Sequence, residues 1–224
     1  MRHARDIAGW FIRNGYNPTN NRDGNLKLNK ILYFAQLISL IKRDKALFEE
    51  ELYAFKNGVV VESIRTEYSK GYHNFINLVQ KTECNFTSSE LDILELTKSI
   101  FLDVSPEELS DLTHEHKSWS IHYKKSKDEA YGGYDYNKES AKINIEDYFG
   151  KFKCDLDLVR EIIEAKECKE DVSEEVISIN GVQYYYNPKE VTINNYILKK
   201  LKEFPATEDA YTFYIDESQG LIIF

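Results

Sequence analysis

The sequence predicts a mainly α-helical protein with a small α+β appendage at its C-terminal end. Apolar residues recur at helical spacing through roughly the first two thirds of the 224-residue chain, and after about residue 172 they alternate instead. We therefore expect a helical domain over residues 1–150. Residues 151–224 are expected to form a linker helix followed by the α+β appendage.

The N-terminal part should contain two helices that differ in their surroundings. Residues 3–14 have one apolar face, which predicts an amphipathic helix. A polar loop is expected over residues 19–25. Residues 26–43 are apolar on nearly every side, which is typical of a helix buried in a core, so we expect this helix to be the central one.

The middle of the helical domain is predicted from turn and capping signals. Residues 47–55 should form a short helix or an extended segment, which ends at the turn dipeptide Asn57-Gly58. Two helices are expected over residues 62–69 and 72–80. The sequences Thr-Ser-Ser-Glu at 87–90 and Ser-Pro-Glu-Glu at 105–108 are capping boxes, which mark the starts of two further helices.

The C-terminal part changes from helical to strand patterns. Residues 155–169 predict an amphipathic helix, and Asn180-Gly181 predicts a tight hairpin because both residues accept positive φ. A helix is expected over residues 192–204. A second pair of strands is expected over residues 210–215 and 221–224.

Tyrosines are the candidates for contact with a partner, because the ring buries area while the hydroxyl remains hydrogen-bonded. Residues 124–138 are polar and contain glycines, so we expect a surface loop there. The candidate partner-binding residues are Tyr131, Tyr134 and Tyr136 of this loop, with Tyr184 and Tyr186 of the C-terminal part. The run 184–186 can also alternate between the two faces of a strand, with one ring, such as that of Tyr185, in the core.

Charge and composition exclude several classes of partner. The net charge is −9, which argues against a broad phosphate-binding surface, so nucleic acid is not an expected partner. Residues 151–224 hold 9 basic and 15 acidic residues, so the acidity is concentrated there. The sequence has neither a signal-peptide pattern nor an apolar run of about 18 residues, so we expect a cytoplasmic protein without a membrane partner.

Three histidines are the candidate ligands of a metal site. His114, His116 and His122 lie close together in the sequence, but residues at i and i+2 do not share a helix face. The sequence also lacks a His-Glu-x-x-His pair and the motifs of nucleophilic, nucleotide-binding or dinucleotide-binding enzymes. We therefore predict no catalytic residue, no metal and no cofactor. A metal-dependent enzyme that uses His114 and His116 stays as the alternative.

The segment Leu-Lys-Leu-Asn-Lys-Ile-Leu-Tyr-Phe-Ala-Gln at residues 26–36 resembles the Panacea antitoxin domain, also called the SocA-like or phage-associated GepA-like family. Residues 47–60 and 109–119 resemble further motifs of this family in order and spacing, and the resemblance covers roughly residues 3–145. The chain departs from the family at Val59, where proline is usual, and at Phe55, where tryptophan is frequent.

The resemblance implies an all-helical domain of bacterial and phage toxin–antitoxin pairs, which neutralises a cognate protein toxin by direct complex formation. Some relatives act as adaptors that deliver the toxin to a protease, so a proteolytic adaptor is a second alternative. The motif positions, for which the residues suggest structural roles, are Lys30, Tyr33, Gln36, Gly58, His114 and Trp119. Tyr33 and Trp119 are expected to fill the core, Gly58 to permit the turn, and His114 to bridge helices by a hydrogen bond. The C-terminal appendage lies outside the resemblance and is expected to supply the partner-specific surface.

Overall fold

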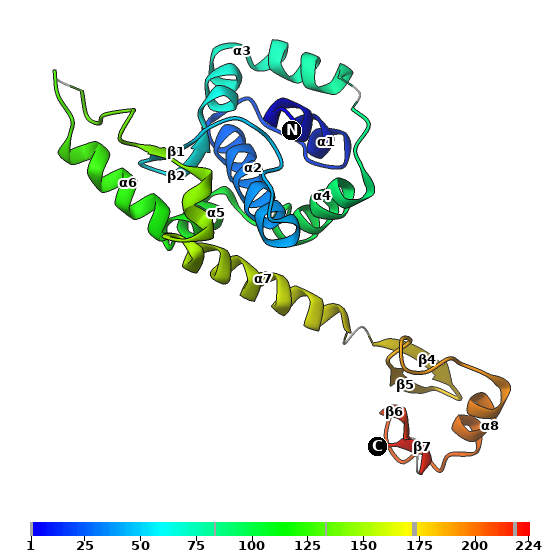
Figure 1. Ribbon diagram of the computed structural model, residues 1–224. Coiled ribbons are helices and arrows are strands. Elements are labelled where there is room, and N and C mark those ends of the chain that lie inside the picture. Colours follow the sequence, from blue (N-terminus) through cyan, green and yellow to red (C-terminus); the bar gives the residue numbers. More distant parts are fainter. Residues whose placement is uncertain (1, 83, 133, 172–173, 217–218) are drawn as a thin grey trace. The chain divides into compact units, whose positions relative to one another are not determined.

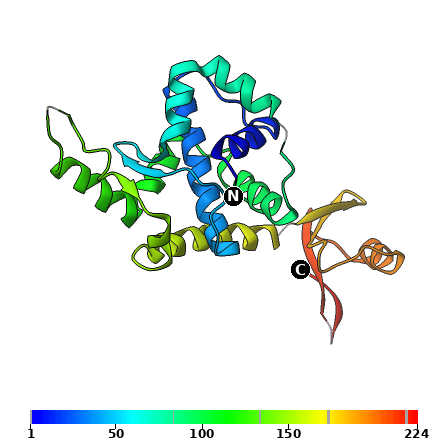
Figure 2. The ribbon, with the colours of Figure 1, turned by 45° about the horizontal axis from the view of Figure 1, so that its top comes forward.

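A computed structural model describes residues 2–82, 84–132, 134–171, 174–216 and 219–224, without the side chains of residues 169–171. The chain divides into two compact units, Met1–Ile162 and Ile163–Phe224, each with its own hydrophobic core (Figures 1 and 2). The prediction of a mainly helical chain with a C-terminal α+β part is confirmed. None of the helices in the described part of the chain is both long and apolar enough for a membrane span.

Helices make up most of the first unit. They are α1 (Ala4–Arg13), α2 (Arg22–Arg43), α3 (Glu62–Lys81), α4 (Ser88–Phe101), α5 (Pro106–His114), α6 (Lys117–Asp128) and the short 3-10 helix η1 (Ile145–Phe149); α7 (Lys153–Asp171) begins in this unit. Helix α2 lies among α1, α3 and α4 (Figures 1 and 2), and its residues from Leu28 to Leu40 are all buried. A helix that is apolar all round is stable only in such an interior.

The two predicted capping boxes are confirmed at the starts of α4 and α5. The Thr87 hydroxyl accepts a hydrogen bond from the N–H of Glu90, whose carboxylate accepts one from the N–H of Thr87. Ser105 and Glu108 repeat the pair, with Pro106 in the first turn. Each box satisfies two backbone donors that a helix start would otherwise leave free.

A small sheet corrects the all-helical expectation for the first unit. Strands β1 (Leu52–Phe55), β2 (Gly58–Val61) and β3 (Lys142–Ile143) form an antiparallel sheet in the order β2-β1-β3. Residues 52–61 thus form a hairpin, in which Leu52 pairs with Val61 and Phe55 with Gly58. Strand β3 was not predicted, because two residues are too few to show an alternating pattern.

Two predicted boundaries in the first unit are also wrong. Residues 22–25, expected in a loop, form the first turn of α2, where the Asn21 side chain accepts a hydrogen bond from the N–H of Gly24. The expected loop over residues 124–138 begins later, because α6 continues to Asp128. The two helices expected at 62–69 and 72–80 are confirmed as the two parts of α3, which meet at a kink at Gly71, where the backbone is not helical.

The second unit contains a four-stranded sheet with a helix. Its elements are β4 (Glu175–Ile179), β5 (Val182–Tyr186), α8 (Asn195–Glu203), β6 (Ala210–Asp216) and β7 (Gly220–Ile223). The predicted hairpin at Asn180-Gly181 is confirmed, with φ of 55° and 85°. The strand order is β4-β5-β6-β7, and β5 and β6 are parallel because α8 lies in the connection between them.

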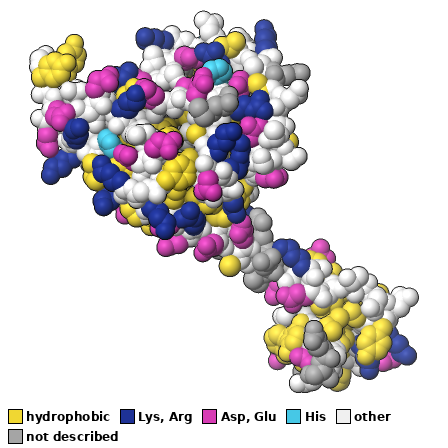
Figure 3. Space-filling model, in the orientation of Figure 1, with side chains coloured by type: hydrophobic (Ala, Val, Ile, Leu, Met, Phe, Trp, Pro, Cys, Tyr) yellow, Lys and Arg dark blue, Asp and Glu magenta, His cyan; other side chains and the backbone are white. Residues whose placement is uncertain are grey.

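The two faces of this sheet differ in their cover. The inner face packs on α8 through residues such as Tyr184, Tyr186 and Phe213. The opposite face, which we call the outer sheet face, carries apolar side chains that include Val176, Tyr214 and Phe224, exposed by 52%, 39% and 66%. Figure 3 shows apolar side chains gathered on this unit. An open apolar sheet face of this kind is unusual for an isolated domain and is typical of an interaction surface.

Candidate functional site

Two consecutive residues of α2 close the free edge of strand β2. Asn29 Oδ1 accepts a hydrogen bond from the N–H of Val61, and Lys30 Nζ donates one to the carbonyl of Val59, both at 2.9 Å. Both side chains are fully buried. Buried backbone groups that lack partners cost free energy. Asn29 therefore supplies the acceptor, and Lys30 the donor, that a further strand would provide.

Gly58 lies beside Lys30 at the start of β2. Its φ of 92° belongs to the left-handed region that favours glycine. A Cβ atom at this position would also lie less than 3.0 Å from Lys30 Nζ and from Thr113 Oγ1. Burial lowers the pKa of Lys30 well below its usual range, because the ammonium form would lose its water. Position 58 therefore requires glycine for two reasons: the positive φ of the turn and the close contact with a buried lysine.

Gln36, six residues after Lys30 on α2, binds the backbone of residues 47 and 48, which precede the hairpin. Its Oε1 accepts hydrogen bonds from the N–H groups of Leu47 (2.8 Å) and Phe48 (3.1 Å), and its Nε2 donates to the carbonyl of Phe48 (3.1 Å). The side chain is fully buried. One amide therefore satisfies three backbone groups of a segment whose opposite side forms a β-bridge with Arg2.

Tyr33 begins a chain of buried polar groups. Its hydroxyl lies 2.6 Å from Nδ1 of His116 and 3.1 Å from the hydroxyl of Tyr148, which lies 3.0 Å from the Ser118 hydroxyl. Burial lowers the pKa of His116 to about 4, so its imidazole is neutral at neutral pH. The chain joins α2, α6 and η1 through groups that are all hydrogen-bonded, which is the condition for a polar network to be tolerated in a core.

The start of α6 is held by a carboxylate from α7. The buried side chain of Asp155 accepts hydrogen bonds from the N–H groups of Lys117 (2.8 Å) and Ser118 (2.9 Å). A negative charge at a helix N-terminus is stabilised by the free N–H groups and by the helix dipole. Asp155 therefore holds the N-terminus of α6 in place, next to the hydrogen-bonded network of Tyr33 and His116.

Trp119 and His114 pack against each other at the edge of this core. Their ring centroids are 4.1 Å apart, and Trp119 Nε1 donates a hydrogen bond to the carbonyl of Phe55 at 2.8 Å. Both side chains are half-buried, so Trp119 fills the core only in part. His114 Nε2 has no hydrogen-bond partner among the described residues, and Nδ1 lies 3.9 Å from Oδ1 of Asp111 on the same helix. A hydrogen bond from His114 to another helix stays a prediction. Burial and the charge of Lys30 lower the pKa of His114.

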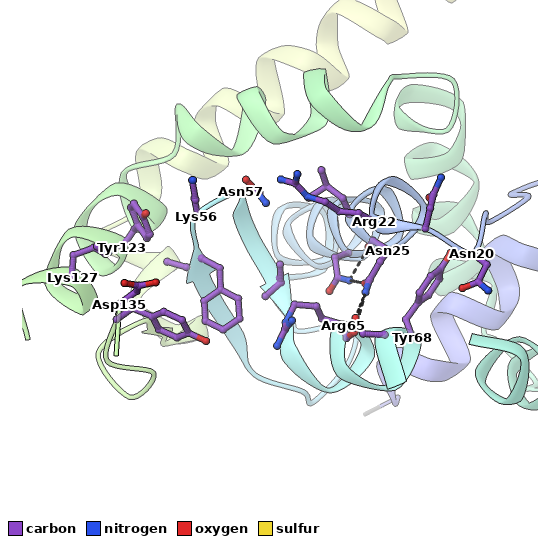
Figure 4. Close-up of a pocket in the computed structure, with 18 residues that line it drawn as sticks. Asn20, Arg22, Asn25, Lys56, Asn57, Arg65, Tyr68, Tyr123, Lys127 and Asp135 are labelled. Atoms are coloured by element: carbon purple, nitrogen blue, oxygen red, sulfur yellow. Dashed lines mark hydrogen bonds between the residues drawn. The ribbon is translucent and has the colours of Figure 1, made fainter. Parts of the chain in front are cut away.

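A cleft of about 810 Å³ opens beside this core (Figure 4). Arg22 and Asn25 of α2 and Arg65 and Tyr68 of α3 form one part of its lining, and Lys56 and Asn57 belong to the hairpin turn. Tyr123 and Lys127 of α6, with Asp135 of the following loop, form the opposite part (Figure 4). Segments separated by about a hundred residues in the sequence thus meet around one space. The cleft was not predicted from the sequence, although the asparagines at 20, 21, 25 and 29 indicate an unusually polar start to a buried helix.

The loop tyrosines lie near or beyond this cleft. Tyr131 and Tyr134 are exposed by 73% and 75%. Tyr136 is exposed by 40%, lines the cleft, and packs against the Phe55 ring with centroids 5.1 Å apart. All three rings are accessible, which a partner-binding role requires.

The placement of Tyr184 and Tyr186 corrects the sequence interpretation. Their exposed fractions are 1% and 7%, since both point to the inner face of the sheet in the second unit. The Tyr184 hydroxyl donates to the carbonyl of Leu201, and that of Tyr186 to the Glu175 carboxylate. Because side chains alternate along a strand, Tyr185 is the ring that points outward. Tyr184 and Tyr186 are therefore core residues and do not form a surface.

The histidines do not assemble a metal site in the described residues. His116 is engaged with Tyr33, whereas His114 stacks on Trp119. Nδ1 of His122 lies 2.8 Å from the carbonyl of Ser118. Across the described part of the chain, no group of three or more histidine, cysteine, aspartate or glutamate side chains is arranged to hold a metal ion. The absence of a metal in the protein itself stays a prediction.

Residues 28–120 match the family model described as the antitoxin SocA-like, Panacea domain. Residues 28–120 are therefore similar to a Panacea domain. The match runs from the first buried turns of α2 to the first turns of α6 and includes the hairpin. Neither the curated proteins nor the solved structures contain a match to this chain. The resemblance inferred from the motifs at 26–36, 47–60 and 109–119 is confirmed.

The Panacea motif residues of this chain meet one another around the hairpin. Lys30 and Gly58 are adjacent, Gln36 holds the segment before β1, and Trp119 contacts the end of β1. Their polar atoms are directed at the backbone of the same chain. Asn29 belongs to the same arrangement but was not singled out from the sequence. A polar residue within an otherwise apolar helix was the signal that could have identified it.

Proposed function

We propose that this protein is an antitoxin that neutralises a cognate protein toxin by forming a stable complex with it. The match of residues 28–120 to the SocA-like Panacea family is the observation on which the proposal rests. The motif residues of the domain are engaged in bonds within the chain, so in this proposal they maintain the scaffold. Contact with the toxin is made by side chains elsewhere on the surface.

The outer sheet face of the second unit is proposed to contribute to the choice of toxin. It carries Tyr214 and Phe224, whose rings lie 5.9 Å apart, and Val176 lies on the same face on β4, across β5 from β6. Clustered aromatic residues supply most of the affinity in protein interfaces. In this proposal the outer sheet face is the candidate partner-binding surface of the second unit, because Tyr184 and Tyr186 are buried. Tyr131, Tyr134 and Tyr136 of the first unit stay candidates for the same role.

Co-expression tests the proposal. The product of the adjacent open reading frame is expressed alone and together with this chain, and growth and co-purification are scored. We expect the adjacent product to arrest growth, and the full-length chain to restore growth and to co-purify with it. Restored growth without co-purification would contradict neutralisation by complex formation. Restored growth with a fall in the toxin level that depends on a host protease would instead identify a proteolytic adaptor.

A matched pair of variants tests the outer sheet face. Replacing Tyr214 and Phe224 together by threonine keeps a good strand-forming residue but removes the apolar surface. We expect this variant to stay folded and to neutralise poorly. The control is Tyr196→Thr, because Tyr196 is exposed by 61% but lies on α8. Equal loss in both variants would contradict a specific role for the outer sheet face.

A further inference from the structure

The cleft of the first unit is more basic than the protein as a whole. Four cationic side chains and one carboxylate line it, whereas the whole chain has a net charge of −9. Arg65 is neutralised by Glu62, whose carboxylate lies 3.0 Å from one of its guanidinium nitrogens. Arg22, Lys56 and Lys127 have no ion pair among the described residues. Three cations without an ion pair in the described part of the chain therefore face the cleft, against the single carboxylate of Asp135.

Two side-chain amides of the cleft are available to form hydrogen bonds with a peptide backbone. The amides of Asn20 and Asn57 lie on its lining and have no hydrogen-bond partner among the described residues (Figure 4). An asparagine side chain offers both donors and an acceptor, as the backbone of an extended peptide does. The amides of Asn25 and Asn29 are already used, because they bond to groups of α2 and α3. The available amides thus lie beside the available cations.

Of the aromatic rings that line the cleft, Phe55 and Tyr123 are covered by neighbouring groups and Tyr136 is the accessible one, which disfavours a ligand that stacks several bases. The Phe55 ring lies between the Arg65 guanidinium at 5.3 Å and the Tyr136 ring at 5.1 Å. Tyr123 stacks on Trp119 with an interplanar angle of 11°. Proteins that bind single-stranded nucleic acid need open aromatic faces for the bases. The arrangement therefore suits a peptide carboxylate better than a nucleotide.

We propose that this cleft binds an acidic, extended segment of the partner protein. Arg22, Lys56 and Lys127 pair with its carboxylates, and Asn20 and Asn57 bond to its backbone. The proposal rests on the proposed function, in which the partner is the toxin. Opposite charges across the contact would speed association and exclude partners that lack the acidic segment. It would also make binding sensitive to salt, since the cations are at the surface.

The first test measures the chemistry of the cleft in the full-length protein by fluorescence anisotropy. The probe is a fluorescein-labelled peptide of alternating glutamate and alanine, and its control replaces every glutamate by glutamine. We expect the glutamate peptide to bind and the glutamine peptide to bind at least about tenfold more weakly. Equal binding of the two peptides, or no binding of either, would overturn the proposal. Tighter binding of labelled oligothymidylate would overturn it in favour of nucleic acid.

The second test uses charge reversal. In the Lys56→Glu/Lys127→Glu variant we expect affinity for the glutamate peptide to fall about tenfold or more. The matched control is Lys45→Glu/Lys81→Glu, which makes the same change of net charge at exposed lysines away from the cleft. Circular dichroism and the thermal midpoint verify that both variants fold. An equal fall in both variants would show a general charge effect and overturn the proposal.

Pull-down with the adjacent gene product separates this proposal from the proposed function. If the wild-type chain does not bind that product, the proposed function fails, and the peptide measurements still decide the chemistry of the cleft. If the wild type and Lys56→Glu/Lys127→Glu bind the product equally well, the proposed function stands and the cleft proposal fails.

Discussion

Nζ of Lys30 packs directly against the backbone of Gly58 in the interior of the first unit. A Cβ atom on residue 58 would lie less than 3.0 Å from Lys30 Nζ, which donates a hydrogen bond to the neighbouring carbonyl of Val59. Two motif positions that are 28 residues apart therefore depend on each other. The buried lysine fixes the edge of β2, and the glycine leaves the room that this lysine needs.

Gly58→Ala should destabilise the first unit beyond the cost of its backbone conformation. Left-handed backbone costs a non-glycine residue about 1–2 kcal/mol, and overpacking against Lys30 and Thr113 should add about 1–3 kcal/mol. Gly15→Ala is the control, because Gly15 also has a positive φ but only an ordinary contact, with Leu102 at 3.9 Å. Urea unfolding followed by tryptophan fluorescence measures both, since Trp10 and Trp119 lie in this unit. Equal losses would mean that the lysine and threonine move aside.

Gln36→Met should lower the free energy of unfolding by about 3 kcal/mol, because three buried backbone groups of Leu47 and Phe48 lose their partner. Methionine keeps the length of the side chain, so the loss reports on hydrogen bonds more than on packing. Gln80→Met on the exposed side of α3 should change stability by less than about 0.5 kcal/mol. A loss at position 36 no larger than at position 80 would contradict the role of the amide.

Tyr33 should matter for stability and not for partner contact, because its ring is fully buried. We expect Tyr33→Phe to cost about 1–2 kcal/mol through loss of the hydroxyl that meets His116 and Tyr148. Tyr33→Ala should cost about 3–5 kcal/mol. The exposed Tyr131→Phe serves as the control. An unchanged thermal midpoint with lost partner binding would place Tyr33 at an interface instead.

Stability should fall on acidification between about pH 6.5 and about pH 4. Burial lowers the pKa of His116 from 6.5 to about 4, so in this interval the unfolded chain binds a proton that the folded chain does not. The contribution is complete above pH 6.5 and is lost as the pH falls to about 4, with a size on the order of 3 kcal/mol.

His116→Asn tests this assignment, because the amide oxygen can still accept a hydrogen bond from Tyr33 but does not titrate. We expect a shallower dependence of the unfolding free energy on pH in this interval. The remaining slope comes in part from His114 and His122, whose pKa values are also lowered by burial. His73→Asn, at an exposed position of α3, is the control for the substitution itself. An unchanged slope in His116→Asn would contradict the neutral state of His116.

Local signals predicted the elements that depend on neighbours in the chain. The capping boxes at 87–90 and 105–108 and the turn at Asn180-Gly181 are bonds or dihedral preferences within a few residues, and all three are confirmed. The burial of α2 was also predicted from a local pattern, because apolar residues occur on nearly every side of this helix. The small sheet was missed because β3 is too short for a pattern and pairs with β1 across about ninety residues.

The sequence by itself thus determined the helical class, the resemblance to the Panacea family and the residues that carry this resemblance. Only the tertiary structure decided where the polar groups of those residues point. Lys30 and Asn29 bond to the free edge of β2 because α2 packs beside this strand. Tyr184 and Tyr186 are core residues because one face of their strand packs on α8. The cleft exists because α2, α3, the hairpin and α6 meet around one space. Each of these depends on contacts between distant segments, which hydrophobic periodicity and local propensity do not encode.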